Sequence, residues 1–376
     1  MKNMLKTFLK VEAKNIKFKA AFIILLFTIV GCIFYLDRAS FNDLEESAAG
    51  EVIAMNSALD QFRKVDATDT EQSSPIYRNL IQQTSHLGTR TLGMKFNDSD
   101  TIIEGSLALA KERQNIYQLR GFKEIEEYIP STRKNQLDLV KYQTLEKENR
   151  SVYIKNNNLP SYILLVITTF GYFWYLYCGI LSSDILINDD RHSSIVNNYP
   201  YSIGQKLLSK TVNYILLLVS FLTGGIILSM ILGLIKYNDD FSYPIAMLGT
   251  KYQTVDVMTF ILISWGYLVV LTITAVLVSI LLNYFIKNIY IIIFIHMGFF
   301  FLGGLSSIFS RFTWMLPYHY LNYTNVFNGV IAETTNHIQA NILFGGLSLM
   351  ITCIFLVVFI YIRFHLSSTN IRKKEV

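Results

Sequence analysis

Long segments without charged residues are the feature of this sequence that most limits its possible folds. A helix that crosses a bilayer needs about 20 consecutive, mostly apolar residues. Charged residues make up only 16% of the chain, against roughly 25% in soluble domains. The sequence therefore predicts an all-α, polytopic membrane protein with six transmembrane helices. The six segments are Ala20 to Leu36, about Pro160 to Asp184, Lys210 to Lys236, Asp256 to Lys287, Asn288 to Ser310, and a last one with its core at Ile342 to Ile362.

Basic residues at both ends of the chain predict its orientation. Lysines outnumber acids before the first span, and arginine and lysine outnumber acids after the last one. Such residues accumulate on the cytoplasmic side. Both termini are therefore predicted to be cytoplasmic in a multi-pass protein of the cell membrane, which an even number of spans requires. The loops at 184–210 and 285–288 are then cytoplasmic, and the segments 37–157, 236–256 and 311–341 are external.

The order of spans and loops divides the chain into five predicted parts. Residues 1–19 form an amphipathic helix in the cytoplasmic interface, which is either a simple anchor or an elbow helix that braces the transport domain. The other parts are the first transmembrane helix at 20–36, an external helical domain at 37–157, a five-helix transmembrane region at 158–362 with the cytoplasmic loop 184–210, and a basic cytoplasmic tail at 363–376.

The segment 37–157 is predicted to be helical because strand-like alternation is scarce in it. Helices are expected from Asn42 to Asp66 and from Ile76 to Thr89. Two more are expected to follow the capping pairs Ser99-Asp100 and Ser131-Thr132. The domain is either a spacer or a module that faces the substrate or a partner, and the sequence leaves both interpretations open.

The predicted spans carry almost no group that could perform chemistry or hold a coupling ion. No Asp, Glu, Lys or Arg lies deep in them, and His296 is the titratable group of note. Ion-coupled carriers usually keep ionisable residues at that depth. Ion-coupled transport is therefore disfavoured. For His296, a buried hydrogen bond between helices is favoured over a proton relay. The chain also lacks paired carboxylates and the phosphate loop GxxxxGK(S/T), so we expect neither an enzyme nor a metal site.

Aromatic residues are abundant in the spans and have two interpretations. Such rings suit the membrane interface, which is the favoured role for most of them. They also suit the path of an amphipathic substrate, because they offer apolar area with a polar tip. Tyr172 and Tyr175 share a helix face, and this face is predicted to look toward the centre of a dimer. The residues assigned to a substrate path are Tyr172, Trp174, Tyr175, Trp265 and His296.

The loop 184–210 contains the motif that points to a family. Acidic residues are followed by a short half-apolar helix, which Pro200 ends. Ser202 follows at plus two and Lys210 at plus ten, where Lys210 is expected to snorkel at the start of the next span. This spacing resembles that of the permease subunit of type-2 ABC exporters. The span number, the cytoplasmic ends and the long insert between spans 1 and 2 resemble the large-insert branch of that family.

The resemblance implies partners, a cargo and site residues. The loop would dock into a separate cytoplasmic ATPase subunit that binds ATP and Mg²⁺, while this chain would hold no cofactor. The permease would form a homodimer, or a heterodimer with a similar permease, in contact with membrane lipid and without nucleic acid. It would export an amphipathic or hydrophobic cargo, such as an antimicrobial peptide, a lipid or a drug, from a bacterial cell. The docking residues would be Asp184, Asp189, Asp190, Arg191, His192, Pro200, Ser202 and Lys210.

Other functions stay open. A mechanotransmitting ABC permease acts on surface machinery or extracts substrate from the membrane, without passing substrate through its spans. Such a permease usually has four transmembrane spans. A membrane sensor or scaffold transports nothing and needs no ATPase, and its loop 184–210 would be an ordinary solvated connection. The number of spans distinguishes the first alternative from an exporter, and co-purification of an ATPase distinguishes the second.

Overall fold

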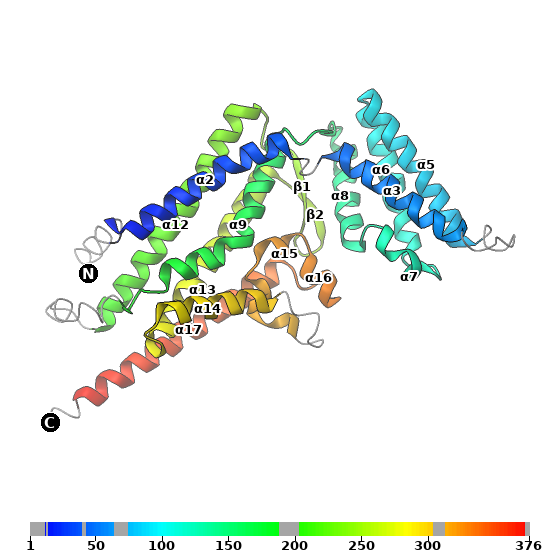
Figure 1. Ribbon diagram of the computed structural model, residues 1–376. Helices are drawn as coiled ribbons and strands as arrows, with labels where there is room; N and C mark the ends of the chain where they lie inside the picture. The colour runs from blue at the N-terminus through cyan, green and yellow to red at the C-terminus, as the bar shows by residue number, and fades with distance from the viewer. Residues whose placement is uncertain are drawn as a thin grey trace. The chain divides into compact units, whose positions relative to one another are not determined.

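The computed structural model describes residues 12, 14–39, 43–63, 74–187, 203–303 and 313–372, and it is 80% helical (Figure 1). Within these ranges, five helices are long and apolar enough to cross a membrane. This agrees with the prediction of a mainly helical, polytopic membrane protein. The five helices are α2 (Ile16–Arg38), α9 (Leu159–Ser182), α12 (Ile203–Tyr237), α13 (Val257–Phe285) and α17 (Ile342–Arg372).

A sixth span stays a prediction. The helix α14 (Ile289–Leu302) occupies the first part of the predicted fifth span and has 14 residues. At 1.5 Å per residue it is about 21 Å long, against roughly 30 Å for the hydrocarbon core of a bilayer. The rest of that predicted span, from 304 onward, lies outside the described residues. The external location of 37–157 and the orientation of the termini stay predictions too.

The chain divides into two compact units. The first unit consists of Met1–Gly31, Val166–Leu232 and Ile261–Val376, and the second of Cys32–Leu165 and Gly233–Phe260. The helices α2, α9, α12 and α13 contribute residues to both units. In the first unit, the connection before α17 is made of short helices with buried tyrosines such as Tyr320. The hydroxyl of Tyr267 in α13 donates to the carbonyl of Tyr320 (2.9 Å). These short helices are η3 (Thr313–Met315), η4 (Pro317–Tyr320), α15 (Tyr323–Phe327) and α16 (Val330–Thr335).

The second unit contains the helices predicted for the segment 37–157, which we call the α3–α8 bundle. Its helices are α3 (Leu44–Arg63), α5 (Pro75–Phe96), α6 (Ser99–Ile116), α7 (Phe122–Ile125), η1 (Glu126–Tyr128) and α8 (Thr132–Glu148). Ser131 caps α8 as predicted, since its side chain accepts from the amide of Lys134. The cap of α6 lies one residue earlier than predicted, because Asp98 accepts from the amides of Asp100 and Thr101.

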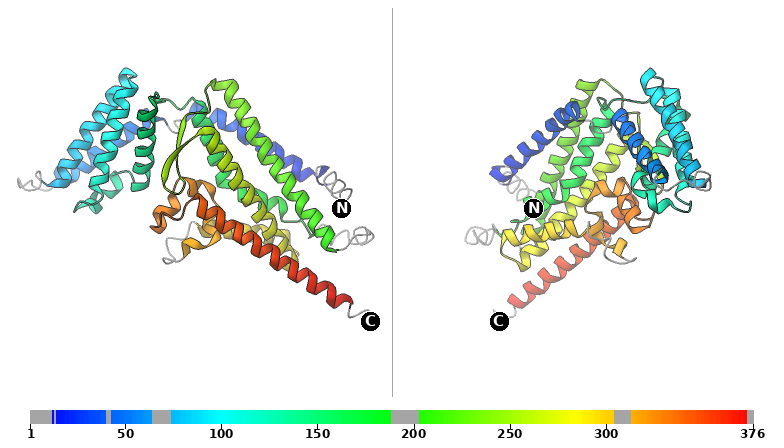
Figure 2. Two further views of the ribbon diagram at one scale, coloured as in Figure 1. Left: turned by 180° about the vertical axis from the view of Figure 1, so that it is seen from behind. Right: turned by 45° about the vertical axis from the view of Figure 1, so that its right-hand side comes forward.

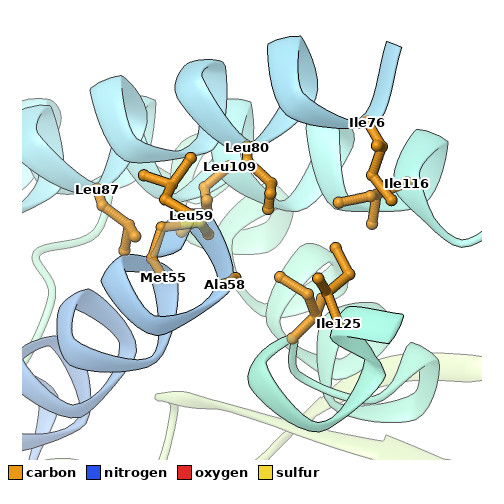
Figure 3. Close-up of a cluster of buried hydrophobic side chains, with 10 residues drawn as sticks. Met55, Ala58, Leu59, Ile76, Leu80, Leu87, Leu109, Ile116 and Ile125 are labelled. Atoms are coloured by element: carbon orange, nitrogen blue, oxygen red, sulfur yellow. The ribbon is translucent and has the colours of Figure 1, made fainter. Parts of the chain in front are cut away.

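Apolar side chains from three helices meet in the core of the bundle (Figure 3). Met55 and Leu59 of α3 point toward Leu80 and Leu87 of α5 and Leu109 of α6. All five are at most 8% exposed. Complete burial of one such side chain stabilises a fold by about 1.5–3 kcal/mol, so this cluster holds the three helices together.

The helices α5 and α6 lie side by side in every view (Figure 2), and two glycines allow their backbones to touch. A Cβ atom on Gly93 would lie 2.8 Å from the amide nitrogen of Ile102. A Cβ atom on Gly105 would lie 2.7 Å from the amide nitrogen of Arg90. Since the atoms in the way are backbone, neither position has room for a larger residue.

A β-hairpin lies in the segment 236–256, which the sequence predicted to be an external loop. The strands β1 (Pro244–Leu248) and β2 (Tyr252–Asp256) pair antiparallel, with Ile245 opposite Val255. The hairpin packs on α8, and the hydroxyls of Thr144 and Thr254 lie 2.7 Å apart. The pattern was missed because each strand has only five residues, which is too few for alternation to be distinctive. The structure, at 80% helix, is still consistent with the predicted all-α class, and this hairpin is a local addition to it.

Candidate functional site

The beginning of the loop 184–210 is fixed to a neighbouring helix by an ion pair. Lys17 of α2 pairs with Asp184, two residues after the end of α9. Its ammonium also donates to the carbonyl of Leu181 (3.1 Å) and to the hydroxyl of Tyr214 in α12 (3.1 Å). Lys17 and Asp184 are 23% and 16% exposed. One ammonium group thus joins three helices where the loop begins.

Asn283 of α13 binds the next turn of the same loop. Its side-chain oxygen accepts from the amides of Leu186 (3.2 Å) and Ile187 (3.3 Å). Its side-chain nitrogen donates to the carbonyl of Ser183 (2.9 Å) and to the carbonyl of Ser279 within α13 (2.7 Å). Asn283 is 5% exposed. A single buried amide group therefore binds two backbone amides of the loop and the carbonyl of Ser183, which directly precedes it.

Lys210 turns toward the same place from the other end of the loop. It is 5% exposed, and its ammonium donates to the carbonyl of Ile185 (3.2 Å). The predicted snorkelling of Lys210 into the lipid headgroups is therefore wrong, because its side chain is buried and its ammonium binds the carbonyl of Ile185. We call Lys17, Asp184, Lys210 and Asn283 the loop-root cluster. The other residues assigned to docking lie outside the described part of the chain: Asp189, Asp190, Arg191, His192, Pro200 and Ser202.

His296 forms the predicted hydrogen bonds between helices. One ring nitrogen, Nε2, lies 2.8 Å from the hydroxyl of Ser279 in α13, and the other, Nδ1, lies 3.0 Å from the hydroxyl of Tyr175 in α9. The hydroxyl of Ser279 also lies 2.7 Å from that of Ser182. His296 has no exposed surface. Its geometry is that of a packing residue with both nitrogens satisfied.

Gly179 is the residue that admits this ring, and its replacement by alanine is expected to destabilise the first unit by about 1–3 kcal/mol. A Cβ atom there would lie 2.8 Å from Cγ of His296, so the ring must move and lose both partners. Thermal unfolding in detergent measures the loss. Gly298→Ala in α14 is the control, because nothing lies within 4 Å of its Cβ position. Equal stability of the two variants would contradict the assigned packing.

The residues assigned to a substrate path have different environments. Trp174 is 3% exposed, and its indole nitrogen donates to Thr272 (2.8 Å). Tyr175 is 1% exposed, whereas Tyr172 is 42% exposed. Trp265 is 37% exposed and donates to Thr223 (3.0 Å). Tyr172 and Tyr175 thus do not present one continuous surface, since a buried network holds Tyr175 while Tyr172 faces outward.

A charged cluster in the α3–α8 bundle was missed by sequence reasoning. Oε2 of Glu51 accepts from Arg90 (2.9 Å) and from Arg113 (2.8 Å). Arg113 also donates to the side chain of Gln83 (3.3 Å). All four side chains are at most 9% exposed. A signal was present, since Arg113 lies four residues after Leu109 and three before Ile116, in register with the apolar stripe of α6.

Electrostatics keep Glu51 ionised. Burial alone would raise the pKa of its carboxyl group. The positive charges of Arg113, Arg90 and Lys134 outweigh burial and lower this pKa from 4.5 to about 2. The cluster therefore holds one carboxylate against two buried guanidinium groups. In the described ranges no group of three His, Cys, Asp or Glu residues could hold a metal ion.

Comparison of this chain with family models, with curated proteins and with solved structures finds no match. Its function is therefore inferred from the local geometry of the loop-root cluster and of the Glu51 cluster.

Proposed function

We propose that this chain is the permease subunit of a type-2 ABC exporter. The observation that carries the proposal is the attachment of both ends of the loop 184–210 to helices. An ordinary solvated connection has no need of fixed ends. A loop that passes movement from an ATPase to the spans must be held rigidly where it joins them, because a loose joint would absorb the displacement. Lys17, Asp184, Lys210 and Asn283 provide that attachment.

In this mechanism a separate ATPase dimer supplies the energy. Its closure on ATP and Mg²⁺ pushes the loops of two permease subunits together. The loop-root cluster passes the movement to α2, α12 and α13, whose tilting opens a path for an amphipathic or hydrophobic cargo. The permease holds neither nucleotide nor metal itself. A mechanotransmitting permease would use the same attachment without a path through the spans, so transport of cargo distinguishes the two.

Co-purification tests the proposal. The tagged chain, extracted from the membranes of its native host, is expected to retain an ATP-hydrolysing subunit. Replacement of both Asp189 and Asp190 by lysine is expected to remove that subunit, because reversed charges at an interface cost several kcal/mol. The control is reversal of Glu126 and Glu127, which are exposed in the α3–α8 bundle. Absence of any ATPase from the unmodified protein would favour a sensor or scaffold.

Thiol labelling tests the proposed orientation. A cysteine in place of Arg120 should react with an impermeant reagent in intact cells, whereas a cysteine in place of Ile195 should react only after the cells are opened. The buried Cys32 and Cys178 and the half-buried Cys353 are removed first. Labelling at 195 from outside would reverse the topology and exclude contact of this loop with a cytoplasmic ATPase.

A further inference from the structure

A charged pocket lies in the second unit, beside the Glu51 cluster. Its volume is about 380 Å³, which is within the range of roughly 300–1,000 Å³ for small-molecule sites. Charged side chains of both signs line it, together with Tyr142 and Tyr153. The charged residues that line it are Asp43, Glu46, Glu51, Arg90, Lys134, Asp138 and Lys141.

The inner wall of the pocket has more positive charge than Glu51 can pair. Oε2 of Glu51 is already shared by Arg90 and Arg113, and its Oε1 lies 3.6 Å from the ammonium of Lys134. Arg90 is 3% exposed, and its Nε has no hydrogen-bond partner among the described residues. A buried guanidinium donor without an acceptor costs about 1–3 kcal/mol or more. Arg90 lines the pocket, and a carboxylate is the group that a guanidinium binds best, so the pocket suits a ligand with a carboxylate.

The remaining charged residues of the pocket indicate which second group the ligand carries. Glu46 and Asp138 line the same pocket, and they disfavour a ligand that carries only negative charge. They suit an ammonium group instead. From this combination we propose that the pocket is a binding site for a small zwitterion of the amino acid or dipeptide class. Arg90 and Lys134 bind its carboxylate, and Glu46 and Asp138 bind its ammonium group.

This site is independent of the proposed transport function, because every charged residue named belongs to the α3–α8 bundle. The rival interpretation is purely structural: the charges only hold the bundle together, and water fills the pocket. The two differ in whether the full-length protein binds a zwitterion that has both charges.

The test uses the full chain in lipid nanodiscs and calorimetric titration at millimolar ligand. Alanyl-alanine is expected to bind. Its C-terminal amide and its N-acetyl form, which each lack one charge, are expected to bind at least about tenfold more weakly, since each loses one charge-assisted pair. Acetate and inorganic phosphate, as anions alone, are expected to be equally weak. Tighter binding of either anion than of the dipeptide would overturn the assignment to a zwitterion.

Two variants locate the site. Lys134→Gln is expected to weaken dipeptide binding about tenfold by removing the charge but not the length of the side chain. Lys134 is 47% exposed, so the bundle should tolerate the change. The control is Lys147→Gln, an exposed lysine on the same helix that does not line the pocket. Equal affinity of Lys134→Gln and the unmodified protein, or no binding of the dipeptide at all, would overturn the proposal.

Discussion

Replacement of Glu51 by alanine is expected to destabilise the α3–α8 bundle by about 3–5 kcal/mol, because it leaves two buried guanidinium groups without their carboxylate. Arg90 and Arg113 come from α5 and α6, so the repulsion between them acts directly on the packing of these two helices. Hydrogen–deuterium exchange of α5 and α6 in the full-length protein measures the effect, and faster exchange in both helices is expected. Glu104→Ala on α6 is the matched control, since Glu104 is exposed.

The same carboxylate predicts a dependence of stability on pH. The pKa of Glu51 is about 2 in the folded protein, against 4.5 for the free group. Because the folded value is the lower one, the stabilisation is complete above pH 4.5 and is lost as the pH falls toward 2. Its size is about 3 kcal/mol, at 1.36 kcal/mol per pKa unit. Glu51→Gln should remove this part of the pH dependence, and an unchanged acid transition in that variant would contradict the assignment.

Replacement of Asn283 by alanine is expected to separate ATP hydrolysis from export in the proposed transporter. The change leaves the amides of Leu186 and Ile187 and the carbonyl of Ser183 without partners. Each buried group left without a hydrogen bond costs about 1–3 kcal/mol, so the loop is expected to detach from α13. We therefore expect the number of cargo molecules exported per ATP to fall at least about tenfold, while the ATPase stays bound.

Thr272→Val is the matched control for that experiment. Thr272 lies in the same helix and accepts a buried hydrogen bond from Trp174 (2.8 Å), but it does not contact the loop. Export and hydrolysis measured together in proteoliposomes give the ratio. If Thr272→Val lowered this ratio as much as Asn283→Ala does, a general loss of packing in α13 would explain both, and the role assigned to the loop-root cluster would be wrong.

The long apolar helices and the caps were predictable because each depends on a short stretch of sequence. Five of the six predicted spans correspond to helices long and apolar enough to cross a membrane, and the cap at Ser131 needed only its own neighbourhood. The interpretation of His296 also held, since a lone polar side chain in an apolar helix requires partners on other helices. These inferences use the properties of single segments, which one sequence supplies.

Features that depend on two distant segments were not predictable in this way. Asn283 reads as one polar residue near the end of an apolar span, and only the folded chain places Ser183 beside it. Glu51 and Arg113 are 62 positions apart, so their pairing is invisible in the spacing of either helix. Lys210 was assigned to lipid for the same reason, because the carbonyl of Ile185 that it binds lies at the far end of the loop.

The hairpin on α8 has a consequence for the order of events during synthesis. In the bundle, α5 packs on α6 and α6 on α8, and such contacts between sequence neighbours form in microseconds to milliseconds. Pro244 begins β1 about 96 residues after Glu148 ends α8, and ribosomes add roughly 5–20 residues per second. The surface of α8 that contacts β1 and β2 therefore stays uncovered for about 5–20 s in each new chain, until the hairpin has been synthesised. During that interval the nascent protein presents Thr144 and its neighbours to whatever chaperone or solvent surrounds it.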